Sequence, residues 1–292
     1  MFLKKKITEW LVNHPNLWVN PLSIYAILRA FTGHLRVLPD FIIIGAAKSG
    51  TTSLYDYLIQ HPSVHTALWK EIYFFDRYFP RGMVWYRANF PSKFQKFFQI
   101  FFLRKNFLTG EATPTYFHHP LTPKRISMLL PSVKLIVLLR NPIDRAYSHY
   151  QMERKFGYEE LSFEEAIVSE DIRLQGESEK MIKDPNYFSY KRQIFSYVTT
   201  GFYAEHLAMW MKYFSKNQLM IINSKDLENN TDRIFQEVLD FLGLDSYKIK
   251  FKKQNVGKYD QMNENTRKIL FEKFESQNKK LYELINKNFN WK

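Results

Sequence analysis

One octapeptide in the first fifth of the chain has the residues and spacing of an anion-binding loop. Residues 45–52 read GAAKSGTT, and Gly45 and Gly50 are spaced like the two glycines of a phosphate-binding loop. The basic residue is Lys48, inside the loop, whereas Thr51 stands where such a loop has its lysine. Backbone N–H groups at a glycine turn before a helix bind anions. We expect a terminal 5′-phosphate group to be surrounded by Lys48, Ser49, Gly50, Thr51, Thr52 and Ser53.

A degenerate ATP-binding loop and a purely structural turn are the alternatives for this octapeptide.

A second candidate anion site follows the segment KLIVLLR, which ends at Arg140. Asn141 and Pro142 are typical of a helix start, and Ser148 lies two turns into that helix. Arg140 with Ser148 could bind a second phosphate, so the two sites suit a nucleotide phosphorylated at both ends. Arg145 shares a helix face with Ser148 and is either a further phosphate contact or a surface salt bridge.

Short apolar runs alternate with helical patterns along the chain, which predicts an α/β fold. Runs rich in β-branched residues or leucine at 41–44, 134–140 and 219–222 are typical of buried parallel strands, and 107–110 could add another. The predicted helices are 51–60, 123–130, 143–154, 163–169, 203–213, 233–242 and 264–286. This order favours a P-loop-like central parallel sheet flanked by helices on both faces, with ligands beyond the carboxyl ends of the strands. Tyr203 and Trp210 are core residues or, alternatively, stack on a ligand.

The composition of the chain favours some classes of binding partner over others. The net charge is +13, which favours polyanions such as nucleic acid, anionic lipid or a multiply phosphorylated small ligand. We find no nucleic-acid-binding signature, so a nucleic-acid partner is not expected. The chain has no cysteine, which excludes disulfides and thiolate metal sites and suits a reducing, cytoplasmic location.

Residues 1–38 are expected to form a basic and apolar helical extension, and residues 39–292 a single domain without repeats or linkers. The extension carries Lys4, Lys5, Lys6, Trp10 and Trp18, but polar residues and prolines interrupt its apolar runs. It therefore lacks the roughly 20 apolar residues of a membrane span, and no signal cleavage site follows it. It either packs on the domain or contacts a membrane peripherally.

Five segments in order carry a resemblance to a known family. They are IIIGAAKSGTTSL, KEIYFFD (70–76), GEATPTYF (110–117), LIVLLRNPIDRAYSHY and NKKLYELINKNFNW (278–291). Taken together the chain resembles the sulfotransferases that use 3′-phosphoadenosine 5′-phosphosulfate (PAPS), nearest to the heparan-sulfate glucosaminyl sulfotransferases and their bacterial counterparts. The resemblance runs from residue 41 almost to residue 292.

The resemblance implies a sulfuryl transfer from PAPS to a hydroxyl or amine of a carbohydrate or glycolipid acceptor, without a metal. By position, Lys48 matches the lysine at the bridging oxygen and 5′-phosphate, and Arg140 with Ser148 matches the pair at the 3′-phosphate. Glu71 matches the catalytic base of the heparan-sulfate branch. Gly257 and Lys258 resemble the late basic loop that closes over the 3′-phosphate. Ala112 departs from the lysine of the 3-O branch, and the disulfide of that branch cannot form here.

Alternatives to these assignments remain. Glu71 could instead form a salt bridge with Lys70, and His118 and His119 are rival bases. A nucleotide-dependent kinase with a variant P-loop, or a non-catalytic module that binds anions or membranes, are the competing functions.

Overall fold

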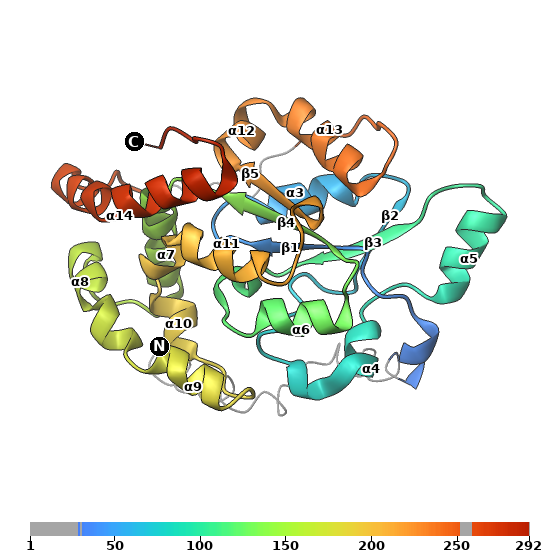
Figure 1. Cartoon of the computed structure of the whole chain (residues 1–292), viewed down its shortest axis with the longest axis horizontal. Coiled ribbons are helices and arrows are strands. Elements are labelled where there is room, and N and C mark those ends of the chain that lie inside the picture. The colour runs from blue at the N-terminus through green and yellow to red at the C-terminus, as the bar shows by residue number, and fades with distance from the viewer. Residues whose placement is uncertain (1–28, 30, 252–258, 292) are drawn as a thin grey trace.

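A five-stranded parallel sheet forms the centre of the computed structural model, which describes residues 29, 31–251 and 259–291 (Figure 1). The strands are β1 (Phe41–Gly45), β2 (Val64–Thr66), β3 (Leu108–Ala112), β4 (Lys134–Leu139) and β5 (Leu219–Asn223). Their order is β2-β3-β1-β4-β5, and every neighbouring pair is parallel. This confirms the predicted α/β fold with a central parallel sheet. The sequence did not reveal β2, which is only three residues long.

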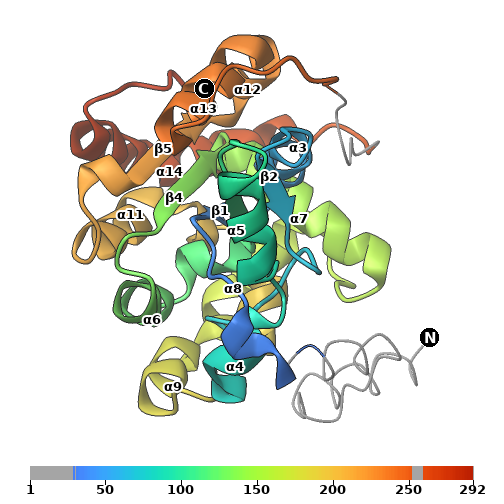
Figure 2. The same ribbon diagram turned by 90° about the vertical axis from the view of Figure 1, so that its right-hand side faces the viewer.

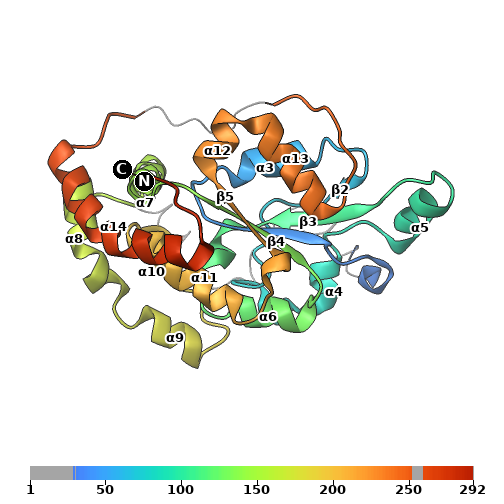
Figure 3. The same cartoon turned by 45° about the horizontal axis from the view of Figure 1, so that its top comes forward.

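Helices cover both faces of the sheet, which explains the continuous apolar runs of β1 and β4. Alternate residues of β1 point to opposite faces, as they must in a strand. Ile42 and Ile44 join a core with α6 (Thr122–Leu129) and α11 (Tyr203–Met211). Phe41 and Ile43 join a second core with α3 (Thr51–Leu58) and α13 (Thr231–Leu242). These two helix layers lie on opposite sides of the sheet in Figures 1 and 3.

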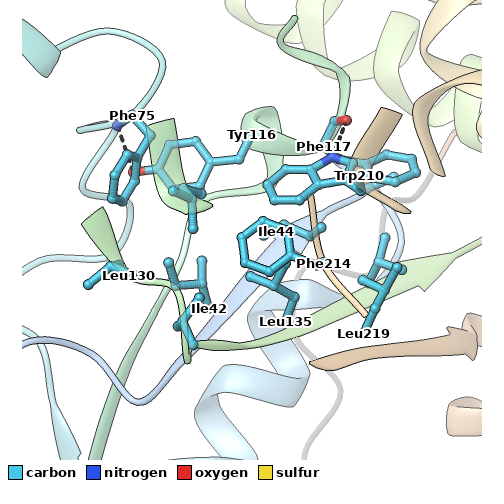
Figure 4. Close-up of a cluster of buried hydrophobic side chains, with 14 of the residues drawn as sticks. Ile42, Ile44, Phe75, Tyr116, Phe117, Leu130, Leu135, Trp210, Phe214 and Leu219 are labelled. Carbon is cyan, nitrogen blue, oxygen red and sulfur yellow. Dashed lines mark hydrogen bonds between the residues drawn. The ribbon is translucent and has the colours of Figure 1, made fainter. Parts of the chain in front are cut away.

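Aromatic side chains complete the first of these cores. In Figure 4 Trp210 and Phe214 lie beside Ile44 and Leu135, and the Trp210 Nε1–H donates to the Phe117 carbonyl at 2.9 Å. Trp210 is fully buried and Tyr203 is 1% exposed, so both are core residues, as the helical spacing favoured. The buried indole retains a hydrogen-bond partner, as such groups require.

The remaining helices extend the layers around the sheet. Those after β4 are α7 (Pro142–Phe156), α8 (Phe163–Leu174), α9 (Glu177–Lys183), α10 (Tyr190–Phe195), α12 (Ser224–Asn229) and α14 (Glu264–Ile285), and those before β3 are α4 (Gly82–Arg87) and α5 (Lys93–Phe101). The predicted start of α7 is confirmed, because the Asn141 side chain accepts from the Ile143 N–H at 3.0 Å and Pro142 follows it. Four helices, α4, α5, α9 and α10, were not predicted from the sequence.

The predicted strand 107–110 ends two residues before the observed strand does. β3 runs to Ala112, because Glu111 pairs with Ile42 and Ala112 with Ile43 across the ladder to β1. Glu111 is therefore a buried strand residue rather than part of the loop that follows.

The predicted N-terminal extension lies mostly outside the described residues. Where the description begins, Arg29 donates to the carbonyls of Ala88 and Phe90, each at 2.7 Å. A 3₁₀ turn (η2, Gly33–Leu35) then precedes β1. The division near residue 38 stays a prediction. Among the described residues, no helix combines the length and apolarity that crossing a bilayer needs.

Candidate active site

The loop between β1 and α3 is shaped by close packing and by left-handed backbone. A Cβ on Gly45 would lie 2.5 Å from the Cβ of Phe117, so only glycine fits at the end of β1. Gly50 caps α3 with φ 92°, and Lys48 also has a positive φ, 68°. Non-glycine residues in this region cluster at ligand sites. The first turn of α3 leaves N–H groups without intrahelical acceptors, which directs positive partial charge at the loop.

Lys48 reaches across this loop to α7. Its Nζ lies 3.5 Å from the Sδ of Met152, a weak acceptor. Met152 and Ser148 are four residues apart and share a face of α7, so the Lys48 ammonium lies on the face that carries Ser148. Burial lowers the pKa of Lys48 below its usual value, and the positive charge of Arg140 adds to this effect. An anion bound here would offset both the cost of burying the Lys48 charge and the repulsion between Lys48 and Arg140.

Arg140, at the end of β4, lies against the same loop. Its Nη1 donates to the Lys48 carbonyl at 3.3 Å, and its own carbonyl accepts from the Tyr203 hydroxyl at 2.9 Å. Ser148 is 7% exposed on α7. The structure thus brings Lys48, Arg140 and Ser148 to one edge of the sheet, the carboxyl edge of β1 and β4. Their binding of two phosphates stays a prediction.

Lys70 is a cation of the site that the sequence did not indicate. Its Nζ donates to the Thr52 hydroxyl in the first turn of α3 at 2.8 Å. Burial lowers the pKa of Lys70, while the negative charge of Glu71 raises it. Lys70 therefore adds a second ammonium to the anion loop. From the sequence, Lys70 is considered only as a salt-bridge partner of Glu71.

Glu71 directly follows Lys70, the residue that contacts Thr52. Burial raises the pKa of its carboxyl, and a hydrogen bond from Tyr73 and the charge of Lys70 offset part of the increase. The Lys70 ammonium donates a hydrogen bond to Thr52 and acts on Glu71 through its charge. A carboxylate with a raised pKa is suited to take up a proton near neutral pH.

A buried network from β3 fixes the segment that carries Glu71. Glu111 is fully buried and accepts from the hydroxyls of Tyr86 at 2.6 Å and Thr113 at 2.7 Å. The Thr113 hydroxyl in turn accepts from the N–H of Ile72 at 3.2 Å, the residue after Glu71. Burial raises the pKa of Glu111 to about 7. Glu111 is thus linked through Thr113 to the backbone beside Glu71, and no signal in the sequence distinguished it from a loop carboxylate.

The structure contradicts one of the two interpretations of Arg145, the surface salt bridge, and leaves the phosphate contact a prediction. The side chain is fully buried, so it is not a surface salt bridge. Its Nη2 donates to the Tyr197 carbonyl, and the Glu170 carboxylate helps to offset its charge. The i, i+3 spacing placed Arg145 near Ser148 along the helix. It could not show that α8 and the segment before α11 cover that side of α7.

The rival bases are poorly suited to their role. Burial lowers the pKa of His119 to about 3 and that of His118 well below its usual value. The Nδ1 of His119 accepts from the Leu121 N–H at 3.2 Å, which makes it a capping group. Such imidazoles are neutral but weakly basic at neutral pH.

The predicted late loop, Gly257 and Lys258, lies outside the described residues. On one side of it, Phe251 contacts Tyr57 of α3 with ring centroids 5.1 Å apart. On the other, Tyr259 contacts Tyr147 of α7 at 5.5 Å. Both flanks therefore adjoin helices that begin at the anion loop and at Arg140.

The fold and this arrangement define a class of protein. Residues 38–291 match the family model described as sulfotransferase domain, so the chain belongs to the sulfotransferase family. The family match sets aside the kinase and the non-catalytic module, and the chain is a sulfotransferase enzyme.

Individual relatives agree with this assignment. The chain is 30% identical to a membrane-associated sulfotransferase of Dictyostelium discoideum, over 89% of this chain and 68% of that protein. It is 28% identical to the bifunctional heparan sulfate N-deacetylase/N-sulfotransferase 1 of Caenorhabditis elegans, over 93% of this chain but 33% of the other. It is 33% identical to the heparan sulfate glucosamine 3-O-sulfotransferase 3B1 of Mus musculus, over 72% of this chain and 47% of the other. The chain thus spans half or less of the two heparan sulfate enzymes.

A solved structure matches nearly the whole fold. The crystal structure of a sulfotransferase from Alicyclobacillus acidocaldarius superposes with a TM-score of 0.63 at 26% identity, covering 87% of this chain and 98% of the other.

Proposed function

We propose that this sulfotransferase moves a sulfuryl group from PAPS to a hydroxyl or amine of a carbohydrate-containing acceptor, with Glu71 as the base. The observation that carries the proposal is the convergence of three cations from separate segments on one anion loop. Arg140 donates to the loop at the Lys48 carbonyl, and Lys70 donates to the loop at Thr52. A donor with a 5′-phosphosulfate and a 3′-phosphate fits this arrangement, with Lys48 and Lys70 at the phosphosulfate and Arg140 at the 3′-phosphate. The names of the heparan sulfate relatives support a carbohydrate acceptor.

In this mechanism the acceptor oxygen or nitrogen attacks sulfur in line with the bond to the bridging oxygen. The new bond to sulfur forms while the bond from sulfur to the 5′-phosphate oxygen breaks, and the acceptor proton passes to the Glu71 carboxylate. Lys48 and Lys70 balance the negative charge that develops on the departing 5′-phosphate, which leaves as part of 3′-phosphoadenosine 5′-phosphate (PAP). Such transfers depend on alignment and charge stabilisation.

The remaining assignments complete the donor site. Loop and helix N–H groups or hydroxyls are supplied to the 5′ end by Ser49, Gly50, Thr51, Thr52 and Ser53. Arg140 with Ser148 binds the 3′-phosphate. Gly257 and Lys258 are proposed to close over that phosphate. We also propose a cytoplasmic location, on the basis of the cysteine-free sequence.

Ligand-dependent stabilisation tests the donor site without requiring the acceptor. Thermal unfolding would be followed with PAP, AMP or ATP in the absence of divalent metal. We expect PAP to stabilise most, because it alone carries both the 5′- and the 3′-phosphate. A ligand at a hundredfold excess over its Kd adds about 2.7 kcal/mol to the free energy of unfolding. Arg140→Ala should abolish the preference for PAP over AMP. Lys280→Ala, which removes an exposed cation of α14, is the matched control.

Equal stabilisation by PAP and AMP would refute the 3′-phosphate site, and a preference for ATP would refute the donor assignment. Transfer from labelled PAPS to a panel of oligosaccharides, glycolipids and small hydroxyl compounds then tests the acceptor class. Labelling confined to non-carbohydrate acceptors would refute the acceptor proposal while leaving the donor site intact.

A further inference from the structure

Helix α5 exposes its apolar face to solvent. It leads into β3 from the amino end of that strand, at the edge of the sheet opposite the anion loop, and protrudes on the right of Figure 1. Figure 2 shows it facing the viewer. Phe94, Phe101 and Phe102 are 73%, 59% and 67% exposed. We call the following exposed residues the α5 surface: Phe94, Phe97, Phe98, Ile100, Phe101, Phe102 and Leu103.

The face of α5 that contacts the rest of the protein is polar. Gln99 is the buried residue of this helix; its Oε1 pairs with the His65 Nε2 at 2.7 Å and its Nε2 donates to the Asn106 carbonyl at 2.7 Å. Lys96 forms an ion pair with Asp40 at 3.6 Å. A helix of a soluble domain normally buries its apolar face. In α5 the arrangement is reversed.

The exposed rings form a continuous surface rather than isolated contacts. The centroids of Phe97 and Phe101 are 4.6 Å apart, and those of Phe98 and Phe102 are 5.2 Å apart. Phe94 extends the row toward Phe98 at 6.4 Å. Single exposed apolar residues are ordinary, whereas a contiguous patch indicates an interaction surface.

The charged residues of the segment that carries the α5 surface are all basic. From Arg77 to Gly110 the sequence contains no Asp or Glu, and its basic residues are Arg77, Arg81, Arg87, Lys93, Lys96, Arg104 and Lys105. Lys93, Arg104 and Lys105 are exposed at the two ends of the aromatic row. Aromatic side chains bordered by cations suit the boundary between anionic headgroups and acyl chains.

We propose that the α5 surface binds the surface of an anionic membrane. The rings enter the headgroup and acyl boundary while Lys93, Arg104 and Lys105 contact lipid phosphates. This surface is distinct from the membrane contact predicted for residues 1–38. Because α5 lies at the opposite edge of the sheet from Lys48, the bound enzyme directs its donor loop away from the bilayer. Membrane binding then localises the enzyme without covering the donor site.

Co-sedimentation of the full chain with lipid vesicles tests the proposal. We expect binding to vesicles of phosphatidylcholine mixed with phosphatidylglycerol, weaker binding to phosphatidylcholine alone, and loss of binding at high salt. The combined substitution Phe94→Ser, Phe101→Ser and Phe102→Ser should weaken partitioning by at least about tenfold. The matched control is Val168→Ser with Ile172→Ser on α8, two apolar residues that are 79% and 78% exposed.

A charge variant separates electrostatic attraction from ring insertion. Replacing Lys93, Arg104 and Lys105 by Gln should weaken binding to anionic vesicles roughly a hundredfold, at about fivefold per charge, and leave binding to phosphatidylcholine little changed. Binding by the triple serine variant equal to that of the unchanged chain would overturn the proposal and assign the membrane contact to another segment. A dimer that becomes a monomer in the serine variant, without lipid binding by either, would also overturn it in favour of a second copy of the chain.

Discussion

Replacing Glu111 by Gln should change how stability depends on pH. Glu111 is fully buried, and burial raises its pKa to about 7 in the folded chain against 4.5 for the ordinary side chain. The folded state therefore favours the protonated carboxyl. Its stabilising contribution is complete below pH 4.5 and is lost as the pH rises through 7.

The size of this effect follows from the two pKa values. Each unit of difference corresponds to about 1.4 kcal/mol, so the wild-type chain should lose about 2 to 3 kcal/mol from Glu111 between pH 5 and pH 8. Glutamine has no charge to bury. Relative to wild type, Glu111→Gln should therefore gain about 2 to 3 kcal/mol over that range. A constant cost is added, because the amide accepts the hydrogen bonds from Tyr86 and Thr113 less well.

Urea unfolding of both proteins at several pH values measures the difference directly. Other buried groups titrate in both proteins. One is Asp76, whose pKa burial raises to about 6 and whose charge raises the pKa of Glu111, so the difference reports Glu111 together with this coupling. Glu275→Gln, at an exposed position of α14, is the control for removing one carboxylate. A stability difference between Glu111→Gln and wild type that stays constant from pH 5 to pH 8 would refute the reasoning.

Three further substitutions test the site. Glu71→Gln should lower kcat by about 10² to 10⁴ while PAP affinity is kept, and it should abolish the rise of the rate with pH through the raised pKa of Glu71; a mutant that keeps its turnover contradicts the assignment. Lys48→Ala should reduce transfer more than PAP affinity, by about 10² or more in kcat, and equal losses in both would indicate ground-state binding only. Thr113→Val removes the acceptor of the Ile72 N–H at a cost of about 1 to 3 kcal/mol in unfolding free energy and should lower kcat without changing PAP affinity. Rescue by Thr113→Ser distinguishes the hydroxyl from the methyl group, and an unchanged kcat in the valine variant would exclude a positioning role.

Much of the fold could be predicted from short segments of the sequence. The run at 41–44 is continuous and β-branched because both faces of β1 are covered, and Asn141-Pro142 specifies the start of α7 through its cap. The loop at 45–52 follows from backbone requirements as well, since Gly45 and Gly50 stand where packing or a positive φ excludes a side chain. Such features depend on neighbouring residues and on the period of the pattern.

The tertiary structure alone decided which faces are covered and which distant segments meet. Periodicity placed Arg145 near Ser148, but only packing against α8 and Tyr197 showed that its guanidinium is enclosed. The contact of Lys70 with Thr52 joins segments 18 residues apart. The outward rings of α5 broke the rule that apolar faces are buried. A pattern in sequence fixes which residues share a side of an element, whereas burial, and with it pKa and reactivity, depends on what the rest of the chain places against that side.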